Sequence, residues 1–228
     1  MIATIHRHGV ALIRDAIPAE SLSEVLPPLV TYYGSPDEAD AGAAGKHRKW
    51  ALANGLTGPN LEKEQRLILA AAGKSIVADC ARRYLGAHAL AVATDHFLFR
   101  CRDARFAPLA AAEGWKHGFH QDHNLIPQSY PMNVWLPLTK IDNNCVGLSL
   151  AFPYTTEIFE LPLDIDGYLN RNDGWLWTPK MDVGDVLLFH HCTIHGSYVE
   201  LKPTARYSAE FRVGRWDSRL EIPVEVFG

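Results

Sequence analysis

Two histidines and one carboxylate in this chain are placed where they could bind a single metal ion. His120 and Asp122 are separated by one residue, so on an extended strand their side chains would point to the same side. His195 follows the apolar run Val186–His190, which is typical of a buried strand, and is the best-placed third ligand. Two imidazoles and one carboxylate leave about three positions of an octahedral Fe(II) ion free. The pattern predicts an open non-haem iron centre, although zinc is also compatible with these ligands.

A second group of residues could bind an organic anion beside that metal. Arg206 opens a β-rich stretch after the turn at residues 202–204, and its guanidinium can make a bidentate contact with a carboxylate. Ser208 shares that face of the strand and can donate its hydroxyl to the same group. Arg212 also shares the face, but at strand rise it lies ~20 Å away, too far to bind the same carboxylate. Together with the metal ligands, Arg206 favours an oxygenase.

The part of the chain before Gly86 is mainly helical in pattern. A short strand at Val10–Ile13 is followed by a helix that Pro18 opens and that Pro27-Pro28 should break or kink. Residues 34–60 lack periodicity and are expected to form an exposed loop. The next two predicted helices are 61–72, with Asn60 as N-cap and Gly73 as stop, and one that carries Ile76, Val77, Cys80, Ala81, Tyr84 and Leu85 on one face and ends at Gly86.

After Gly86 the sequence changes to short β-rich runs separated by Pro, Gly, Asp and Asn. Many short strands with turn signals indicate a β-sandwich or barrel. A chain of 228 residues is large enough for one core, so we expect a single domain, with helical support in residues 1–86 and a mainly β core in residues 87–228. The predicted strands are 89–101, 116–120, 133–138, 147–152, 186–190 and 205–213.

Composition argues against several other classes of protein. The net charge of -4 and the ordinary content of hydrophobic residues (47%) and charged residues (21%) give no indication of nucleic-acid or membrane-surface binding. The apolar runs are too short to span a bilayer, and no signal peptide is apparent. Four cysteines without a CxxC pair argue against a zinc ribbon or a disulfide scaffold. We therefore expect a cytoplasmic enzyme, either monomeric or homodimeric, with a small-molecule substrate.

Several motifs stand in a fixed order along the chain. They are Phe119-His120-Gln121-Asp122, Asn133-Val134-Trp135-Leu136-Pro137-Leu138, Gly184-Asp185-Val186-Leu187-Leu188-Phe189-His190, Ile194-His195-Gly196-Ser197 and Arg206. In residue type and spacing they resemble the phytanoyl-CoA dioxygenase (PhyH) family of Fe(II)- and 2-oxoglutarate-dependent oxygenases. The resemblance covers most of the chain and implies a double-stranded β-helix, also called a jelly-roll or cupin-like core. It further implies that His120, Asp122 and His195 bind iron.

The same resemblance implies a binding site for 2-oxoglutarate. Arg206 would bind its distal carboxylate, with Ser208 beside it, while the 2-oxo acid end chelates iron. Trp135 would line this pocket, although a buried core aromatic explains it equally well. Phe97, on the strand before His120, is a further candidate for the pocket. O2 would be consumed, succinate and CO2 released, and an unactivated C–H bond of a small organic molecule hydroxylated.

The substrate is expected to meet residues 34–60, 123–130 and 155–182. The last of these segments contains Trp175 and Trp177 in an aromatic and charged mixture suited to a polar ligand, or simply forms a solvated loop with two anchoring tryptophans. Relatives usually carry Pro-Gly-Ser-His where this chain has Phe152-Pro153-Tyr154-Thr155, and the chain is short for the family. The pocket mouth should therefore differ, and an open pocket would admit a carrier-tethered substrate. Because Asp122 is present, hydroxylation is favoured over halogenation.

Two other classes compete with this interpretation. A cupin-like metalloenzyme that does not use 2-oxoglutarate, such as an O2-dependent epoxidase or a zinc hydrolase, would not need Arg206. A catalytically silent barrel would have no reason to keep His120, Asp122 and His195 together.

Overall fold

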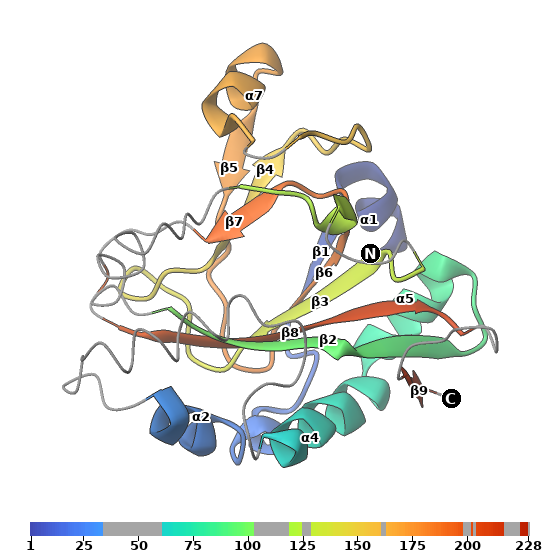
Figure 1. The fold of residues 1–228 in the computed structure, drawn as a ribbon, viewed down its shortest axis with the longest axis vertical. Helices are drawn as coiled ribbons and strands as arrows, with labels where there is room; N and C mark the ends of the chain where they lie inside the picture. The colour runs from blue at the N-terminus through green and yellow to red at the C-terminus, as the bar shows by residue number, and fades with distance from the viewer. Residues whose placement is uncertain are drawn as a thin grey trace.

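Two antiparallel sheets face each other in the computed structural model, which describes residues 1–33, 61–102, 119–124, 129–160, 163–197, 202, 204–216 and 224–227 (Figure 1). The larger sheet has six strands in the order β1-β6-β3-β8-β2-β9, and the smaller sheet has three in the order β5-β4-β7. This is the double-stranded β-helix that the family resemblance implies, and it agrees with the sandwich or barrel that the strand pattern indicates. The strands are β1 (Val10–Ile13), β2 (Leu90–Arg102), β3 (Met132–Pro137), β4 (Leu148–Phe152), β5 (Trp175–Trp177), β6 (Val186–His190), β7 (His195–Ser197), β8 (Arg206–Arg215) and β9 (Val224–Phe227).

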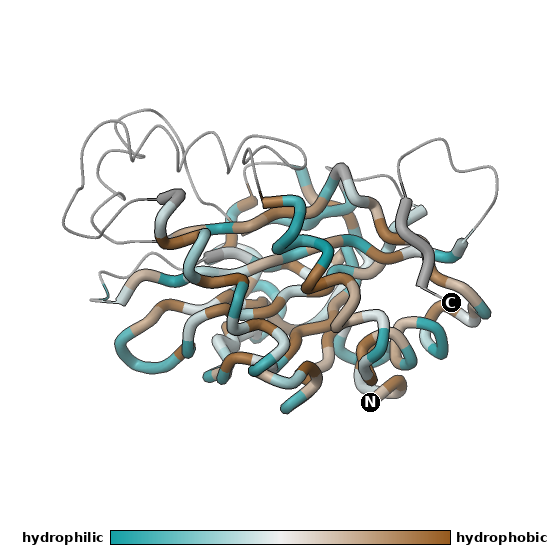
Figure 2. The backbone as a smooth tube through the Cα atoms, turned by 90° about the horizontal axis from the view of Figure 1, so that it is seen from below, coloured by the Kyte–Doolittle hydropathy of each residue, from teal (hydrophilic) through white to brown (hydrophobic). Residues whose placement is uncertain are grey.

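Helices cover the outer face of the larger sheet. In Figure 1, α2 and α4 lie on the side of β2 and β8 that faces away from the smaller sheet, and α7 lies at the opposite end, beyond β5. Hydrophobic stretches run through the sheet and helix traces in Figure 2 and form the core between these layers. The helices are α1 (Ile2–His8), η1 (Ala19–Leu22), α2 (Leu26–Tyr33), α4 (Glu62–Gly73), α5 (Ile76–Leu85), η3 (Asp122–Asn124) and α7 (Ile165–Arg171).

Strand β8 separates an apolar layer from a polar one. On its helix-facing side, Tyr207, Ala209, Phe211 and Val213 belong to the large hydrophobic core. The alternate side chains point between the two sheets, and they are polar although all are buried. Burying such groups is costly unless they find partners, so this face indicates where the functional site lies. The four polar residues are Arg206, Ser208, Glu210 and Arg212.

A second hydrophobic cluster fills one end of the space between the sheets. Trp135 of β3 and Phe189 of β6 come from the larger sheet, and Leu148 and Leu150 come from β4 of the smaller one. All four are buried. This cluster holds the two sheets together beside the polar face of β8, and so fixes the distance across which the site is built.

Five of the six strands predicted after Gly86 are confirmed with bounds shifted by at most two residues. The sixth, 116–120, is not: residues 116–118 lie outside the described residues, and His120 forms only an isolated bridge.

The first helix also differs from the prediction. The structure splits it into η1 and α2, and Pro27-Pro28 lie in the first turn of α2 rather than breaking a helix. Proline is tolerated there because the first-turn N–H groups have no intrahelical acceptor. Helix α4 includes Gly73 and has Leu61 as its N-cap, while the proposed cap Asn60 lies outside the described residues. Helix α5 ends as predicted, at Gly86 in the left-handed conformation.

Among its described residues, the segment 155–182 contains regular secondary structure and is not only a solvated loop. It contains α7, whose N-cap Asp164 accepts a hydrogen bond from the Gly167 N–H, and β5, which pairs with the edge of β4. The predicted wall at residues 34–60 lies outside the described residues. Among the helices that the structure describes, none is long and apolar enough to cross a bilayer.

Candidate metal centre

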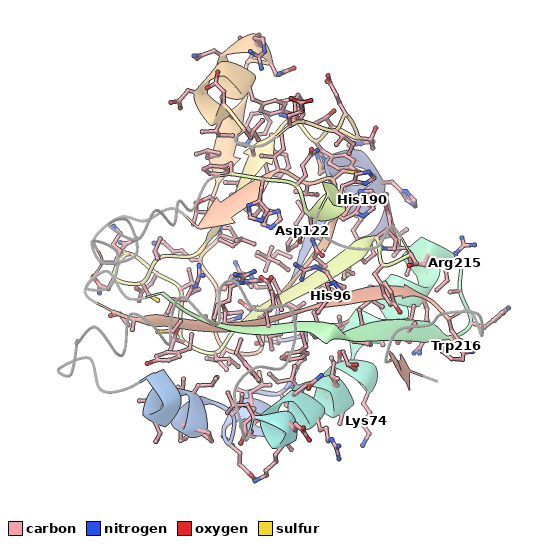
Figure 3. All side chains as sticks on the ribbon, in the orientation of Figure 1. Lys74, His96, Asp122, His190, Arg215 and Trp216 are labelled. Atoms are coloured by element: carbon pink, nitrogen blue, oxygen red, sulfur yellow. The ribbon has the colours of Figure 1, made fainter. Side chains whose placement is uncertain are left out.

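His120, Asp122 and His195 come together at the edge of the smaller sheet. The His120 and His195 backbones pair in an isolated antiparallel bridge, with N–H···O distances of 2.9 Å in both directions. The prediction that His120 and Asp122 lie on one regular strand is wrong, because Asp122 begins the short helix η3. The turn of η3 orients the carboxylate instead. Figure 3 shows Asp122 in the space between the two sheets.

The geometry of these three side chains fits a single metal ion. Asp122 Oδ1 lies 3.4 Å from His120 Nε2 and 3.8 Å from His195 Nε2. Ligand atoms ~2.1 Å from a common ion are expected roughly 3–4 Å apart. Asp122 and His195 are buried, whereas the His120 side chain is 29% exposed. The centre is therefore open on the His120 side.

His195 is held in the tautomer that a metal ligand needs. Its Nδ1 lies 2.9 Å from the Thr193 carbonyl oxygen, and donating a proton there leaves Nε2 with a lone pair towards Asp122. Burial lowers the pKa of His195 to about 4, so the ring is neutral near pH 7. The loop is fixed in turn to the end of α1, because the Gly9 carbonyl accepts hydrogen bonds from the Thr193 hydroxyl and from His190 N–H.

Asp122 presents only one of its oxygens to the histidines. Its Oδ2 accepts hydrogen bonds from Arg212 Nη2 at 2.7 Å and from Asn133 Nδ2 at 2.9 Å. Burial by itself raises the pKa of Asp122, but Arg212 and the two neighbouring histidines together hold it well below its usual range. The carboxylate therefore stays ionised, and Oδ1 is the atom available to a metal.

The charge of Arg212 is shared with a second buried carboxylate. Glu210 Oε1 accepts from Arg212 Nη2 at 3.1 Å and from Arg100 Nη2 at 2.7 Å. Burial raises the pKa of Glu210, but the two guanidinium groups outweigh it and lower the pKa to about 2. The formal charges of Asp122, Arg212, Glu210 and Arg100 alternate along this row and cancel.

Sequence reasoning missed this row. The strand pattern placed Arg212 on the same face as Arg206, but no local signal in the sequence connects Arg212 to Asp122. The strand register supplies the link, because β3 pairs with β8 so that Asn133 lies opposite Arg212. The alternation of Arg206, Ser208, Glu210 and Arg212 was the available signal, since a buried strand seldom carries polar residues at every second position.

The three residues predicted to bind an anion also lie together. Arg206 is fully buried, its guanidinium carbon lies 5.6 Å from the Trp135 ring centroid, and its Nη1 donates to the Gly147 carbonyl. Burial lowers the pKa of Arg206 to about 10, so it remains charged near pH 7. Ser208 Oγ and Trp135 Nε1 are buried on the same face, without a hydrogen-bond partner among the described residues. This donor set fits a carboxylate.

The predicted anion-binding residues and the predicted metal ligands meet along β4. Gly147, which accepts the hydrogen bond from Arg206, directly precedes β4. Leu150 of that strand is paired with His195. A molecule with one carboxylate at Arg206 and its other end at the metal would therefore lie along this strand.

The predicted substrate residues are not all near the centre. Phe97 is 1% exposed and stacks on Phe211 in the helix-side core, so it does not line the site. Its neighbour His96 lies on the same side of the larger sheet as Asp122 (Figure 3). A one-residue difference in a strand changes the face, and β2 is irregular between Ala93 and Leu98.

The two tryptophans of β5 differ in their surroundings. Trp177 is paired with Leu150, the residue that is also paired with His195, so all three share the inner face of the smaller sheet. Trp177 packs against the core between the sheets. Trp175 stacks on Phe152 and is 59% exposed, so its contact with substrate stays a prediction.

Low pH is expected to destabilise the metal-free protein through its buried histidines. Burial lowers the pKa of His190, His191 and His195 to about 4 each, from 6.5. Between pH 4 and pH 6.5 the unfolded chain binds more protons than the folded protein. The free energy of unfolding therefore keeps its full value above pH 6.5 and falls as the pH is lowered towards 4, by up to roughly 3 kcal/mol for His195 alone. Urea unfolding of the chelator-treated protein across this window would measure the loss. A flat profile would contradict it, because Asp122 and Glu210 titrate only at lower pH.

The fold and the site define a class of enzyme. Two facing sheets with two histidines and one carboxylate at the edge are the arrangement of non-haem iron oxygenases that depend on 2-oxoglutarate. Residues 5–200 match the family described as Phytanoyl-CoA dioxygenase (PhyH), and the chain belongs to this family. Fe(II), 2-oxoglutarate and O2 are the metal and co-substrates of the class.

Solved structures share the fold at low sequence identity. EctD from S. alaskensis, solved with 2-oxoglutarate and 5-hydroxyectoine, is 16% identical with a TM-score of 0.64, covering 96% of this chain and 77% of its own. The epimerase SnoN, solved with Fe3+, alpha ketoglutarate and nogalamycin RO, is 13% identical with a TM-score of 0.60, covering 94% and 82%. AviO1 from Streptomyces viridochromogenes Tue57 is 12% identical with a TM-score of 0.61, covering 97% and 96%. No curated protein matches the sequence.

Proposed function

We propose that this chain is an Fe(II)- and 2-oxoglutarate-dependent oxygenase that hydroxylates an unactivated C–H bond of a small organic molecule. The observation that carries the proposal is the polar inner face of β8. At one end of this face, Arg206 and Ser208 lie beside Trp135 as a carboxylate-binding set. At the other end, Arg212 orients Asp122 towards two histidines.

Each group has a distinct role in this proposal. His120, Asp122 and His195 hold iron, which supplies O2 activation coupled to the oxidation of the 2-oxo acid to succinate and CO2. Arg206 binds the distal carboxylate, and its burial strengthens that contact by excluding water. Substrate approaches from the partly exposed His120 side.

A small-molecule substrate is supported by the ligands of the structural relatives. EctD was solved with 5-hydroxyectoine, and SnoN with nogalamycin RO. SnoN is an epimerase, so an enzyme with this fold can also catalyse a reaction in which no oxygen atom enters the product. Hydroxylation by this chain is therefore tested by whether the product gains one oxygen atom from O2.

Substitution of Arg206 by alanine is expected to weaken 2-oxoglutarate binding by about tenfold to a hundredfold, because a charged hydrogen bond contributes roughly 1.5–3 kcal/mol. Iron binding should persist. The measurement is an anaerobic titration of the metal-free protein with Fe(II) and then 2-oxoglutarate, which follows the visible charge-transfer band of the chelate.

Arg215→Ala is the matched control, since this arginine ends the same strand but is exposed. An undiminished affinity in Arg206→Ala would contradict the role of Arg206. Iron binding without any chelate band in the unmodified protein would instead favour a cupin-like enzyme that does not use 2-oxoglutarate.

A further inference from the structure

A second group of metal-ligand side chains lies next to the iron centre and is not used by it. His123, His191 and Cys192 each offer one ligand atom, and these atoms lie within 4.8 Å of one another. His123 follows Asp122 in η3, while His191 and Cys192 follow β6. The two segments are joined by a backbone hydrogen bond from His123 N–H to the His191 carbonyl. We call these three residues the cysteine cluster.

The cysteine cluster is preformed, and two of its three residues are buried. His191 and Cys192 are buried, and His123 is half-buried. His123 Nδ1 and His191 Nε2 lie 3.5 Å apart, within the roughly 3.3–3.8 Å expected between two ligands of one tetrahedral zinc ion. These two nitrogens face each other, so a cation bound between them would take a lone pair from each ring.

We propose that His123, His191 and Cys192 form a zinc site separate from the iron centre. One thiolate and two imidazoles favour a borderline-soft ion such as Zn(II), whereas two imidazoles and a carboxylate with open positions suit Fe(II). The fourth position is left to water. The adjacent His190 does not supply it through Nδ1, which contacts the Tyr154 hydroxyl and Cys192 N–H.

The protonation states of the cluster are compatible with metal binding. Burial lowers the pKa of His191 to about 4, so its ring is neutral and has a lone pair to offer. Burial raises the pKa of the Cys192 thiol, so the incoming cation must displace that proton. A hard ion that binds thiolate weakly is thereby disfavoured.

Zinc at this position would stabilise the two segments that carry the iron ligands. Gln121, between His120 and Asp122, donates to the Cys192 carbonyl, and His195 Nδ1 contacts the Thr193 carbonyl. A metal bridge between His123 and residues 191–192 would fix η3 against the loop that leads to His195. The inference does not depend on the proposed use of 2-oxoglutarate.

The test uses Co(II) as a spectroscopic probe for zinc, added anaerobically to the full-length, metal-free, reduced protein. A thiolate-to-cobalt charge-transfer band is expected in the near ultraviolet, and added Zn(II) should remove it. Cys192→Ser should abolish the band, whereas Cys80→Ser, which changes a buried thiol of α5, should retain it. His195→Ala should also retain the band, because that ligand belongs to the iron centre.

His123→Ala is a second test in case Cys192→Ser does not fold, because His123 is only half-buried. This variant should weaken Co(II) binding at the cysteine cluster by tenfold or more. Absence of the thiolate band in the unmodified protein, its survival in Cys192→Ser, or unchanged affinity in His123→Ala would each overturn the inference. The chelate band with Fe(II) and 2-oxoglutarate should persist in Cys192→Ser. Loss of the chelate band alone in the unmodified protein would count against the proposed function and not against the zinc site.

Discussion

Arg212→Gln is expected to destabilise the metal-free protein by roughly 3–5 kcal/mol, the usual effect of removing one partner from a buried ion pair. Arg212 donates to both Asp122 and Glu210, and all three are buried. Without the guanidinium, Asp122 keeps a hydrogen bond from Asn133, but its main compensating charge is lost. Its pKa should rise, and iron binding should weaken as the carboxylate turns or takes up a proton. Urea unfolding of the metal-free protein measures the first effect, and iron titration measures the second.

Arg215→Gln provides the comparison for Arg212→Gln, since an exposed arginine on the same strand should change stability by no more than about 0.5 kcal/mol. A double-mutant cycle with Asp122→Asn isolates the pair from other effects of the substitution. Additive effects of the two changes would show that Arg212 acts without Asp122, contrary to the geometry.

Substitution of His195 by alanine is expected to weaken iron binding by more than roughly 100-fold. Loss of a residue that only orients a metal ligand typically costs roughly 10–100-fold in affinity, and this change removes a ligand itself. The change also opens the buried wall against which Phe189 packs. The chelate band should not form at iron and 2-oxoglutarate concentrations that saturate the unmodified protein. Isothermal titration with Fe(II) under nitrogen gives the affinity directly.

His88→Ala is a suitable control for His195→Ala because His88 is exposed and precedes β2. Circular dichroism of both variants separates a lost ligand from a lost fold. Iron affinity equal to that of the unmodified protein in folded His195→Ala would remove His195 from the metal centre.

Strands and ligands could be predicted from the sequence because both follow short-range rules. Val10–Ile13 and Val186–His190 are strands with the predicted bounds, since apolar runs with turn residues on either side have few alternatives. Arg206 and Trp135 were found through motif order and then meet in space, because neighbouring strands β3 and β8 place them on one face.

What the sequence did not predict depends on strand register and on turns. Arg212 meets Asp122 only because β3 and β8 pair in one particular register, which has no local signature. Phe97 was assigned to the site, but an irregularity in β2 leaves it in the helix-side core. The cysteine cluster combines residues from η3 and from the loop after β6, and their separation in sequence conceals the group.

The cancelling charges behind the metal ligands have a consequence for how much of the enzyme holds metal. Asp122 and Glu210 are balanced by Arg212 and Arg100, so the protein offers a divalent cation little net negative charge. The 2-oxo acid end of 2-oxoglutarate would supply a negative charge at the metal, while Arg206 would neutralise the distal carboxylate. By thermodynamic linkage, 2-oxoglutarate would strengthen metal binding by the same factor by which bound metal strengthens 2-oxoglutarate binding. The fraction of enzyme loaded with iron would then rise with the concentration of 2-oxoglutarate.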